Sequence, residues 1–216
     1  MRNTRRIIIS GGGTGGHIYP AVAIANELRQ IDPSIEILFV GAEGKMEMEK
    51  VPKAGYEIVG LPVAGFNRSA LLANVGFPFK LLKSLRIAKK IIKDFAPDAV
   101  VGVGGYASGP TLFIAGRLGI PTLIQEQNSY AGVTNKLLAK RAKKICVAYP
   151  DMEVFFPKKK ITFTGNHVRN EIVEHSITKQ DALAHFGLSQ SRPTVLIIGG
   201  SQGARSINEA IEANLK

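Results

Sequence analysis

Short runs of aliphatic residues alternate with segments in which apolar side chains recur at helical spacing. The first run, residues 5–10, contains three consecutive isoleucines, which suit a parallel strand covered on both faces. We expect strands at residues 5–10, 35–40, 56–61, 99–103, 121–124, 145–148, 161–164 and 194–198. We expect helices at 17–30, 81–93, 110–117, 134–144, within 176–190 and from 206 onward, with a charged connection or short helix at 43–53. This alternation predicts an α/β fold with a doubly wound, Rossmann-like parallel sheet.

Glycine-rich turns join a strand to a helix at three places, residues 11–16, 104–109 and 199–203. Glycines allow a sharp turn or the close approach of a ligand, and the following helix start offers free N–H groups to an anion. We place Pro20 in the first turn of the helix that follows the first of these turns, where its missing N–H costs nothing. The spacing Gly11-x-Gly13-x-x-Gly16 also matches a dinucleotide fingerprint with Glu43 as the ribose acid, so a nicotinamide-dependent oxidoreductase stays open as an alternative.

Polar candidates stand at the carboxyl ends of two predicted strands. His17 closes the first glycine turn and titrates near neutral pH. The run Gln125-Glu126-Gln127-Asn128 follows the strand at 121–124, and ligands of open α/β sheets gather at this edge. The same four residues are also typical of loop capping, so both interpretations remain open.

Composition and charge limit the compartment in which the protein works and the partners that suit it. The 216 residues carry a formal net charge of +11, which suits anionic lipid, phosphorylated substrates or nucleic acid. The single Cys146 excludes an intrachain disulfide and suits a reducing compartment. The aliphatic run after the basic start is too short for a signal peptide, and no run approaches a membrane span, so we expect a cytosolic protein with at most peripheral membrane contact.

Much of the positive charge lies in residues 66–93, which hold seven Lys or Arg and no Asp or Glu. Leu81, Leu85, Ala88 and Ile92 share one helical face of this segment, and basic residues share another. The apolar stripe either packs on the sheet or meets an anionic membrane, and the basic stripe can face lipid in both cases. The segment has little aromatic interleaving, so we do not expect nucleic acid as a partner. Our candidates for membrane contact are Leu71, Leu72, Val75, Phe77, Phe79, Lys80, Lys83 and Arg86.

Five motifs in order carry a resemblance to a known family. They are residues 12–17 (GGTGGH), 102–110 (GVGGYASGP), 126–128 (EQN), 165–169 (GNHVR) and 199–205 (GGSQGAR). Together they closely resemble the MurG family of bacterial peptidoglycan glycosyltransferases, within glycosyltransferase family 28, over the whole chain. The resemblance implies the GT-B fold, in which two Rossmann-like domains face each other across a cleft. Residues 1–169 then form a complete N-terminal acceptor and membrane domain, and residues 170–216 are a linker and the beginning of a truncated C-terminal donor domain.

The resemblance also implies an activity. Enzymes of this family transfer N-acetylglucosamine from UDP-GlcNAc to the 4-hydroxyl of the muramyl sugar of lipid I, giving lipid II for peptidoglycan. They work at the cytoplasmic face of the membrane as peripheral proteins, invert the anomeric carbon, and require neither a metal nor another cofactor. The absence of an obvious DxD motif from the sequence agrees with the expected lack of a metal site.

The resemblance also implies roles for individual residues at matching positions. Thr14, Gly15 and Gly16 are expected near the donor diphosphate or sugar, and Asn128, Arg169 and Ser201 are expected to contact the donor. His17 is our candidate for the general base on the acceptor hydroxyl, while Arg169 and the helix start after Gly203 would stabilise the leaving diphosphate. Candidates on the acceptor side are Gly104, Gly105, Tyr106, Ser108 and Glu126.

Because the family's second domain continues well beyond the third glycine turn, we expect residues 1–216 alone to bind UDP-GlcNAc weakly and to turn over little. A second hypothesis is a non-catalytic platform that docks on lipid and recruits a partner carrying the donor site. Replacing His17 by Ala in a full-length chain separates the two, because only the enzyme loses transfer while lipid docking survives under both.

Overall fold

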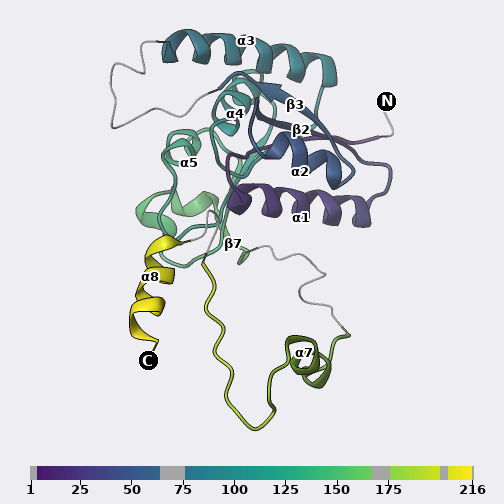
Figure 1. Cartoon of the computed structure of the whole chain (residues 1–216). Coiled ribbons are helices and arrows are strands. Elements are labelled where there is room, and N and C mark those ends of the chain that lie inside the picture. Colours follow the sequence, from purple (N-terminus) through teal and green to yellow (C-terminus); the bar gives the residue numbers. More distant parts are fainter. Residues whose placement is uncertain (1–3, 64–75, 167–175, 200–203, 216) are drawn as a thin grey trace. The chain divides into compact units, whose positions relative to one another are not determined.

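A computed structural model describes residues 4–63, 76–166, 176–199 and 204–215 (Figure 1). The chain divides into two compact units, Met1–Val168 and Arg169–Lys216. The assignment of residues 1–169 to an acceptor domain and of 170–216 to the beginning of a donor domain remains a prediction.

The first unit is built on a seven-stranded sheet in the order β3-β2-β1-β4-β5-β6-β7. Every pairing in it is parallel. The strands are β1 (Arg6–Ser10), β2 (Glu36–Ala42), β3 (Glu57–Leu61), β4 (Ala99–Gly102), β5 (Thr122–Glu126), β6 (Lys144–Val147) and β7 (Ile161–Phe163). The helices of this unit are α1 (Gly15–Ile31), α2 (Glu47–Lys53), α3 (Phe77–Phe95), α4 (Ser108–Arg117) and α5 (Val133–Leu138), with short 3-10 turns η2 (Met152–Val154) and η3 (Lys158–Lys160).

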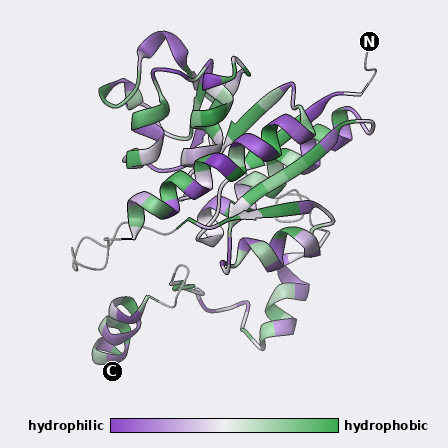
Figure 2. Cartoon of the chain, turned by 90° about the horizontal axis from the view of Figure 1, so that it is seen from above, coloured by the Kyte–Doolittle hydropathy of each residue, from purple (hydrophilic) through white to green (hydrophobic). Residues whose placement is uncertain are grey.

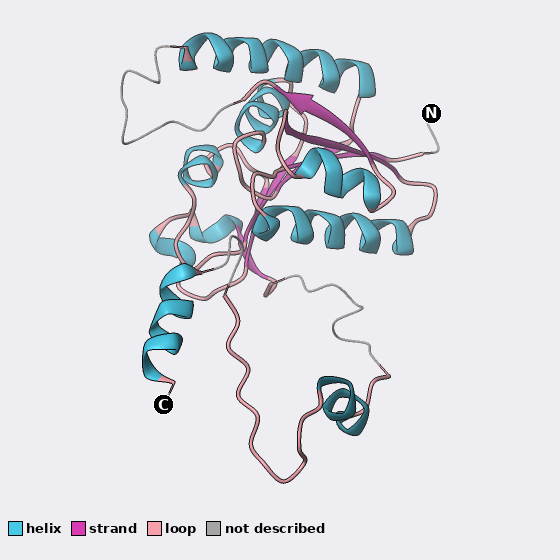
Figure 3. Cartoon of the chain, viewed as in Figure 1, coloured by secondary structure: helices cyan, strands magenta, loops and turns pink. Residues whose placement is uncertain are grey.

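The aliphatic runs form strands because both faces of the sheet are covered. Along β1, Ile8 enters one hydrophobic core and its neighbour Ile9 enters the other. Side chains of α1 and α2 complete the core around Ile9, while side chains of α3, α4 and α5 complete the core around Ile8. Figure 3 shows helices on both sides of the strands. The predicted doubly wound α/β fold is therefore confirmed.

Strand order creates a switch point between β1 and β4. From β1 the chain proceeds to β2 and β3 on one side, and from β4 to β5, β6 and β7 on the other. Ser10 at the end of β1 pairs with Gly102 at the end of β4, so the turns that follow these two strands leave the same edge of the sheet. Crevices at such switch points are where open α/β sheets bind ligands.

Helix α3 is amphipathic along its whole length, and polar and apolar bands alternate on it in Figure 2. Its buried positions are Ser84, Ala88 and Ile92, and the helix lies mainly against α4 and also against β3. Leu81, which we expected on one helical face with Leu85, Ala88 and Ile92, is 37% exposed, whereas Ser84 is fully buried. The buried stripe confirms that the C-terminal half of the helix packs on the protein.

The first turns of α3 keep several apolar side chains in solvent. Phe79 is 75% exposed and Leu82 is 52% exposed, and the candidates Lys80, Lys83 and Arg86 are also exposed. Leu71, Leu72 and Val75 lie outside the described residues. None of the helices described has the length and apolar character needed to cross a membrane.

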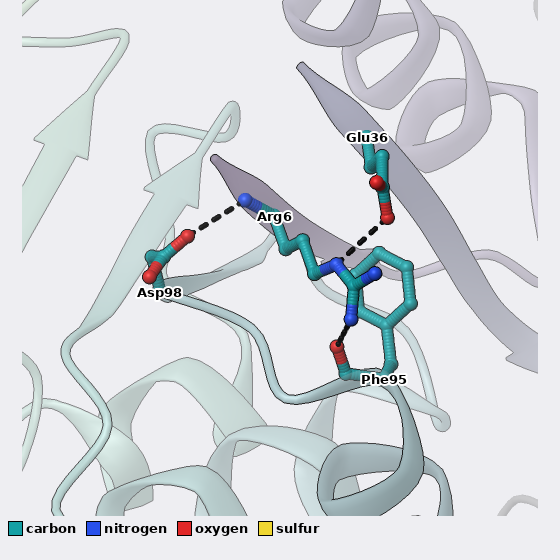
Figure 4. Close-up of polar contacts among 4 residues, drawn as sticks. All are labelled: Arg6, Glu36, Phe95 and Asp98. Carbon is teal, nitrogen blue, oxygen red and sulfur yellow. Dashed lines mark hydrogen bonds and ion pairs between the residues drawn. The ribbon is translucent and has the colours of Figure 1, made fainter. Parts of the chain in front are cut away.

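Arg6 stabilises the opposite, amino-terminal edge of the sheet (Figure 4). Its Nη1 donates to the carbonyl oxygen of Phe95 at 3.1 Å, and its Nε lies 2.7 Å from Glu36 Oε2. The backbone N–H of Arg6 donates to Asp98 Oδ2 at 2.7 Å. These contacts tie β1 to the start of β2 and to the connection between α3 and β4.

The helix expected at 134–144 is shorter than predicted. α5 ends at Leu138, and Lys160 Nζ donates to the carbonyl oxygens of Ala139 (3.3 Å) and Lys140 (2.6 Å), which close the helix end. The backbone N–H of Lys143 already donates to the carbonyl oxygen of Thr122 in β5. The chain has to be extended there because it is entering β6.

In the second unit, α7 (Lys179–Phe186) lies within the segment 176–190 where we expected a helix, and it is capped at both ends. Thr178 and Asp181 form a reciprocal capping box, and Gly187 ends the helix with φ +63°. α8 (Arg205–Asn214) follows the third glycine turn as expected. The strand predicted at 194–198 is wrong: this stretch belongs to no sheet, and Val195 and Leu196 are 80% and 77% exposed. A strand requires a neighbour, and the described part of this unit offers none.

Candidate active site

The first two glycine turns contact each other at the carboxyl edge of the sheet. A Cβ on Gly105, whose φ is +85°, would overlap the carbonyl oxygen of Gly12. A Cβ on Gly11 would overlap the side chain of Val103 and come within 2.8 Å of the carbonyl oxygen of Gly104. Glycine is required at these positions because the two backbones approach closely, and the two turns therefore lie in direct contact.

His17, on the first turn of α1, lies beside Gly104 of the second glycine turn. Its Nδ1 is 3.1 Å from Oγ1 of Thr14, the N-cap residue of the helix. A Cβ on Gly104 would come within 2.8 Å of His17 Nε2 and 2.7 Å of Cδ2, so the imidazole occupies the space that this glycine leaves. The helix start and the second turn together set the orientation of the ring.

Burial lowers the pKa of His17 below its ordinary value of 6.5, and the negative charges of Glu126 and Glu47 oppose that shift. The imidazole is consequently neutral at pH 7, with one ring nitrogen able to accept a proton. A neutral imidazole at the carboxyl edge of the sheet is suited to general base catalysis.

Glu126 organises the loop that follows β5. It is 1% exposed, and its Oε1 accepts hydrogen bonds from the backbone N–H of Asn128 (3.1 Å) and from Asn128 Nδ2 (2.9 Å). Its Oε2 accepts from the backbone N–H of Gly132 and from Asn135 Nδ2, both at 2.9 Å. The carboxylate is thus turned into the loop, where it fixes the side chain of Asn128 and contributes negative charge near His17.

Gln127 joins the first helix to the second glycine turn. Its Nε2 donates to the carbonyl oxygens of Gly16 (2.9 Å) and Val103 (3.0 Å). Two carbonyl acceptors assign the amide orientation, because the reverse orientation would bring its oxygen against both of them. Gln127 belonged to the polar run that we singled out after this strand, but we did not predict these two partners.

Pro20 lies further along α1 than we predicted, and this explains the contact between Gln127 and Gly16. The helix begins at Gly15, so Pro20 lies inside it and not in its first turn. The residue at position 20 would normally donate its N–H to the carbonyl oxygen of Gly16, and proline has no N–H to donate. Gln127 supplies the missing donor, and the proline four residues after Gly16 is the one sequence signal that could have indicated it.

The remaining candidates on the second turn divide by exposure. Ser108 is fully buried and its Oγ donates to the carbonyl oxygen of Gly105 at 3.0 Å, so the hydroxyl braces the turn. Tyr106 is 50% exposed at the same turn. Among the described residues, no protein acceptor lies in hydrogen-bonding geometry with the N–H groups of Gly15 and Gly16.

The structure therefore brings most of the predicted residues to one edge of the first unit. These are Thr14, Gly15, Gly16, His17, Gly104, Gly105, Tyr106, Ser108, Glu126 and Asn128. Arg169 and Ser201 lie outside the described residues. In the part of the chain that the structure describes, no group of three or more His, Cys, Asp or Glu side chains is placed to hold a metal ion.

Glu47, on α2, is a residue that the sequence did not indicate. The residue is 1% exposed, and its carboxylate accepts hydrogen bonds from the backbone N–H groups of Gly13 and Ala42. We expected a charged connection or short helix at 43–53, and nothing in the local pattern distinguishes this glutamate from its exposed neighbours Glu43 and Glu49.

Comparison with known proteins places this arrangement in a family. The model described as the glycosyltransferase family 28 N-terminal domain matches residues 7–147. The chain belongs to glycosyltransferase family 28.

Family 28 relatives match along the whole chain. A Phocaeicola vulgatus protein is 65% identical over 215 residues, covering 100% of this chain and 57% of the relative. A Parabacteroides distasonis protein is 63% identical over 210 residues, covering 97% of this chain and 57% of the relative. Both are named UDP-N-acetylglucosamine–N-acetylmuramyl-(pentapeptide) pyrophosphoryl-undecaprenol N-acetylglucosamine transferase. The chain thus spans a little over half the length of these relatives.

Among solved structures, Acinetobacter baumannii MurG is similar with a TM-score of 0.64 and 31% identity, covering 81% of this chain and 50% of that one. The seven-stranded unit has the Rossmann-like α/β fold of the GT-B glycosyltransferases, as predicted. The family match does not favour the nicotinamide-dependent oxidoreductase that one glycine fingerprint had left open.

Proposed function

We propose that this family 28 chain is the acceptor-binding part of an inverting glycosyltransferase that moves GlcNAc from UDP-GlcNAc to the 4-hydroxyl of the muramyl sugar of lipid I, giving lipid II. The observation that carries the proposal is the 65% identity, along the whole chain, to a relative named for this transfer. A neutral imidazole at the switch-point edge of the sheet supports it, because the chemistry requires a base there.

The reaction is a single displacement at the anomeric carbon of the donor sugar. The acceptor hydroxyl oxygen forms the new bond to that carbon, the bond to the diphosphate oxygen breaks, and UDP leaves with the electron pair. His17 takes the hydroxyl proton, and the lowered pKa of His17 keeps it unprotonated beforehand. Attack opposite the leaving group inverts the configuration.

Roles for the other site residues follow from the family. Thr14, Gly15 and Gly16 are proposed to approach the donor diphosphate or sugar, and the open N–H groups of Gly15 and Gly16 at the positive end of α1 support this. Asn128, Arg169 and Ser201 are proposed donor contacts. On the acceptor side we propose Gly104, Gly105, Tyr106, Ser108 and Glu126, of which Ser108 and Glu126 would act by shaping their turns.

We propose that the protein works as a peripheral protein at the cytoplasmic face of the membrane, where lipid I resides. The first turns of α3 support this, because Phe79 and Leu82 are exposed beside Lys80, Lys83 and Arg86. Exposed apolar groups can enter the lipid interface while each lysine or arginine adds about 1 kcal/mol of attraction to an anionic surface. Leu71, Leu72, Val75 and Phe77 are proposed to extend the same contact.

The activity is testable in a chimera that joins residues 1–216 to the remaining C-terminal portion of the Phocaeicola vulgatus relative. We expect it to transfer GlcNAc from UDP-GlcNAc to a lipid I analogue. His17→Ala should lower kcat by about 100-fold or more, since a positioned base contributes that much. The matched control is His185→Ala, because His185 is exposed on α7.

Absence of transfer by the chimera, with the P. vulgatus protein active in the same assay, would refute the proposed activity and leave the lipid-docking platform. Unchanged kcat in His17→Ala would refute the base. The 216-residue chain alone is expected to bind UDP-GlcNAc weakly and to turn over little or nothing.

Membrane docking has its own assay. The 216-residue chain should sediment with vesicles containing phosphatidylglycerol and not with pure phosphatidylcholine vesicles. Lys83→Ala should weaken that binding by about 5-fold, the equivalent of about 1 kcal/mol, whereas Lys158→Ala on η3 should not. Equal binding to both kinds of vesicle would contradict an electrostatic contact through α3.

A further inference from the structure

A buried carboxylate lies inside the first glycine turn, and the proposed reaction does not use it. Glu47 Oε2 accepts a hydrogen bond from the backbone N–H of Gly13 at 2.8 Å. Its Oε1 accepts one from the backbone N–H of Ala42, the last residue of β2, at 2.9 Å. One side chain therefore joins the turn after β1 to the end of the neighbouring strand.

Glycines in the surrounding backbone leave space for this side chain. A Cβ on Gly12 would overlap the carboxylate of Glu47, and a Cβ on Gly41 would come within 2.6 Å of its Cγ. Gly12 has φ +145° and Gly13 has φ +88°, which L side chains rarely adopt. Two glycines on different segments thus flank the carboxylate, so its position is built into the fold.

The negative charge of Glu47 is met by backbone N–H groups. Among the described residues, no Lys or Arg forms an ion pair with it. Backbone N–H groups of a glycine turn are also the donors that hold phosphate groups in nucleotide-binding proteins. Here the N–H of Gly13 is already occupied by a carboxylate of the protein itself.

We propose that Glu47 is a positioning residue whose carboxylate acts as the resident anion of the first glycine turn, fixing Gly13 and the start of α1 that carries His17, and keeping diphosphate groups away from the Gly12–Gly13 amides. A diphosphate at those amides would have to displace a buried side chain and would meet its charge. The role of Glu47 in binding stands independently, and its role in catalysis rests on the proposed transfer.

Two charged groups face His17 from the elements packed around it, Glu47 from α2 and Glu126 from β5. Both favour the protonated imidazole, so each raises the pH at which His17 loses its proton. Removing the charge of Glu47 while keeping its shape should therefore move the acid limb of the pH–rate profile to lower pH.

The binding test uses inorganic pyrophosphate and the 216-residue chain. Glu47→Ala empties the space beside Gly13, and we expect it to bind pyrophosphate at least about 10-fold more tightly than the unaltered chain. Glu43→Ala is the matched control, because it removes an exposed glutamate from the segment just before α2 and should leave pyrophosphate binding unchanged. Equal affinity of a folded Glu47→Ala variant and the unaltered chain would overturn the proposal.

Glu47→Gln covers the case in which Glu47→Ala does not fold. Its side chain amide has a single oxygen, so the N–H of Gly13 or of Ala42 loses its acceptor. Hydrogen exchange at one of these two amides should accelerate at least about 10-fold, while amides of β5 keep their rates. Unchanged exchange at both amides would overturn the proposal.

The catalytic test uses the chimera. Glu47→Gln should lower kcat, leave the KM for UDP-GlcNAc within about 2-fold, and move the acid limb of kcat/KM to lower pH. A merely structural role would reduce the active fraction without moving that limb, so an unmoved limb counts against the proposal. If the chimera with Glu47 intact is inactive, the transferase proposal fails, and the pyrophosphate and exchange measurements still decide the role of Glu47.

Discussion

The bridge from Gln127 to Gly16 and Val103 allows a sharp stability prediction, because proline and glutamine are coupled through one carbonyl group. Gln127→Leu keeps the approximate size of the side chain and removes its N–H donors. The carbonyl oxygen of Val103 is then buried without a donor, and the carbonyl oxygen of Gly16, in a partly buried contact, loses its partner as well.

The magnitude follows from the burial of the two acceptors. A buried carbonyl left unsatisfied costs about 1–3 kcal/mol, and a partly buried one that water can reach costs nearer 1 kcal/mol. We therefore expect Gln127→Leu to lower the free energy of unfolding by about 2–3 kcal/mol. Pro20→Ala restores a backbone N–H at the position that normally bonds to Gly16, so in that background the loss should be smaller by about 1 kcal/mol.

The assay is urea unfolding of the four members of this double-mutant cycle, followed by far-ultraviolet circular dichroism. With a slope of about 2 kcal/mol per molar urea, a loss of 2–3 kcal/mol lowers the midpoint by about 1–1.5 M. The cycle cancels the volume that Pro20→Ala removes from a buried position. The control is Gln30→Leu at an exposed position of α1, which should change stability by less than about 0.5 kcal/mol.

A coupling energy between positions 20 and 127 below about 0.3 kcal/mol would refute the claim that Gln127 replaces the proline's missing donor. A Gln127→Leu variant as stable as Gln30→Leu would refute the whole assignment of the amide, including its bond to Val103.

Other perturbations test the same site and its support. Gly105→Ala should lower the free energy of unfolding by more than about 2 kcal/mol, because the new Cβ would overlap Gly12. Gly119→Ala is the control, since Gly119 has φ +77° but open space around it, and it should lower the free energy of unfolding by only about 1 kcal/mol. Equal losses in thermal unfolding would contradict the close approach of the two turns. The pKa of His17 measured by NMR should lie below 6.5, and a value above 6.5 would contradict the role of burial. Because the unfolded chain then binds more protons than the folded one, the free energy of unfolding should rise with pH up to about 6.5 and level off there. His17→Gln should remove this rise. Arg6→Ala should lower the free energy of unfolding in urea by about 1–2 kcal/mol, because it removes the contacts to Phe95 and Glu36. It should leave the KM of the chimera unchanged, since Arg6 lies at the amino edge of the sheet. A changed KM would show that the two edges are coupled.

Much of the fold could be predicted because its signals are local. Three consecutive isoleucines alternate between two cores in β1, and the spacing of apolar residues in α1 and α3 reflects one buried face each. The position of the first two glycine turns at one edge of the sheet followed from strand–helix alternation, because parallel strands put their carboxyl ends on the same edge. Their contact depends on the pairing of β1 with β4, which the structure shows.

The contacts that were missed join residues far apart in the sequence. Gln127 bonds to Gly16 across 111 residues, and Glu47 bonds to Gly13 across 34. Their partners are backbone groups, which every residue carries, so no side-chain motif marks them. A charged residue in a charged segment is also expected in solvent, since burying it requires donors that only the folded chain brings together.

By itself, the amino-acid sequence determined the order of strands and helices, the position of the glycine turns and the presence of His17 at the first of them, because periodicity and backbone freedom depend on neighbouring residues. Only the tertiary structure decided which polar groups meet. It placed Gln127 where Pro20 withholds a donor, seated Glu47 beneath Gly13, and left the apolar stretch 194–198 outside any sheet, because hydrogen bonds and strand pairing require a partner from elsewhere in the chain.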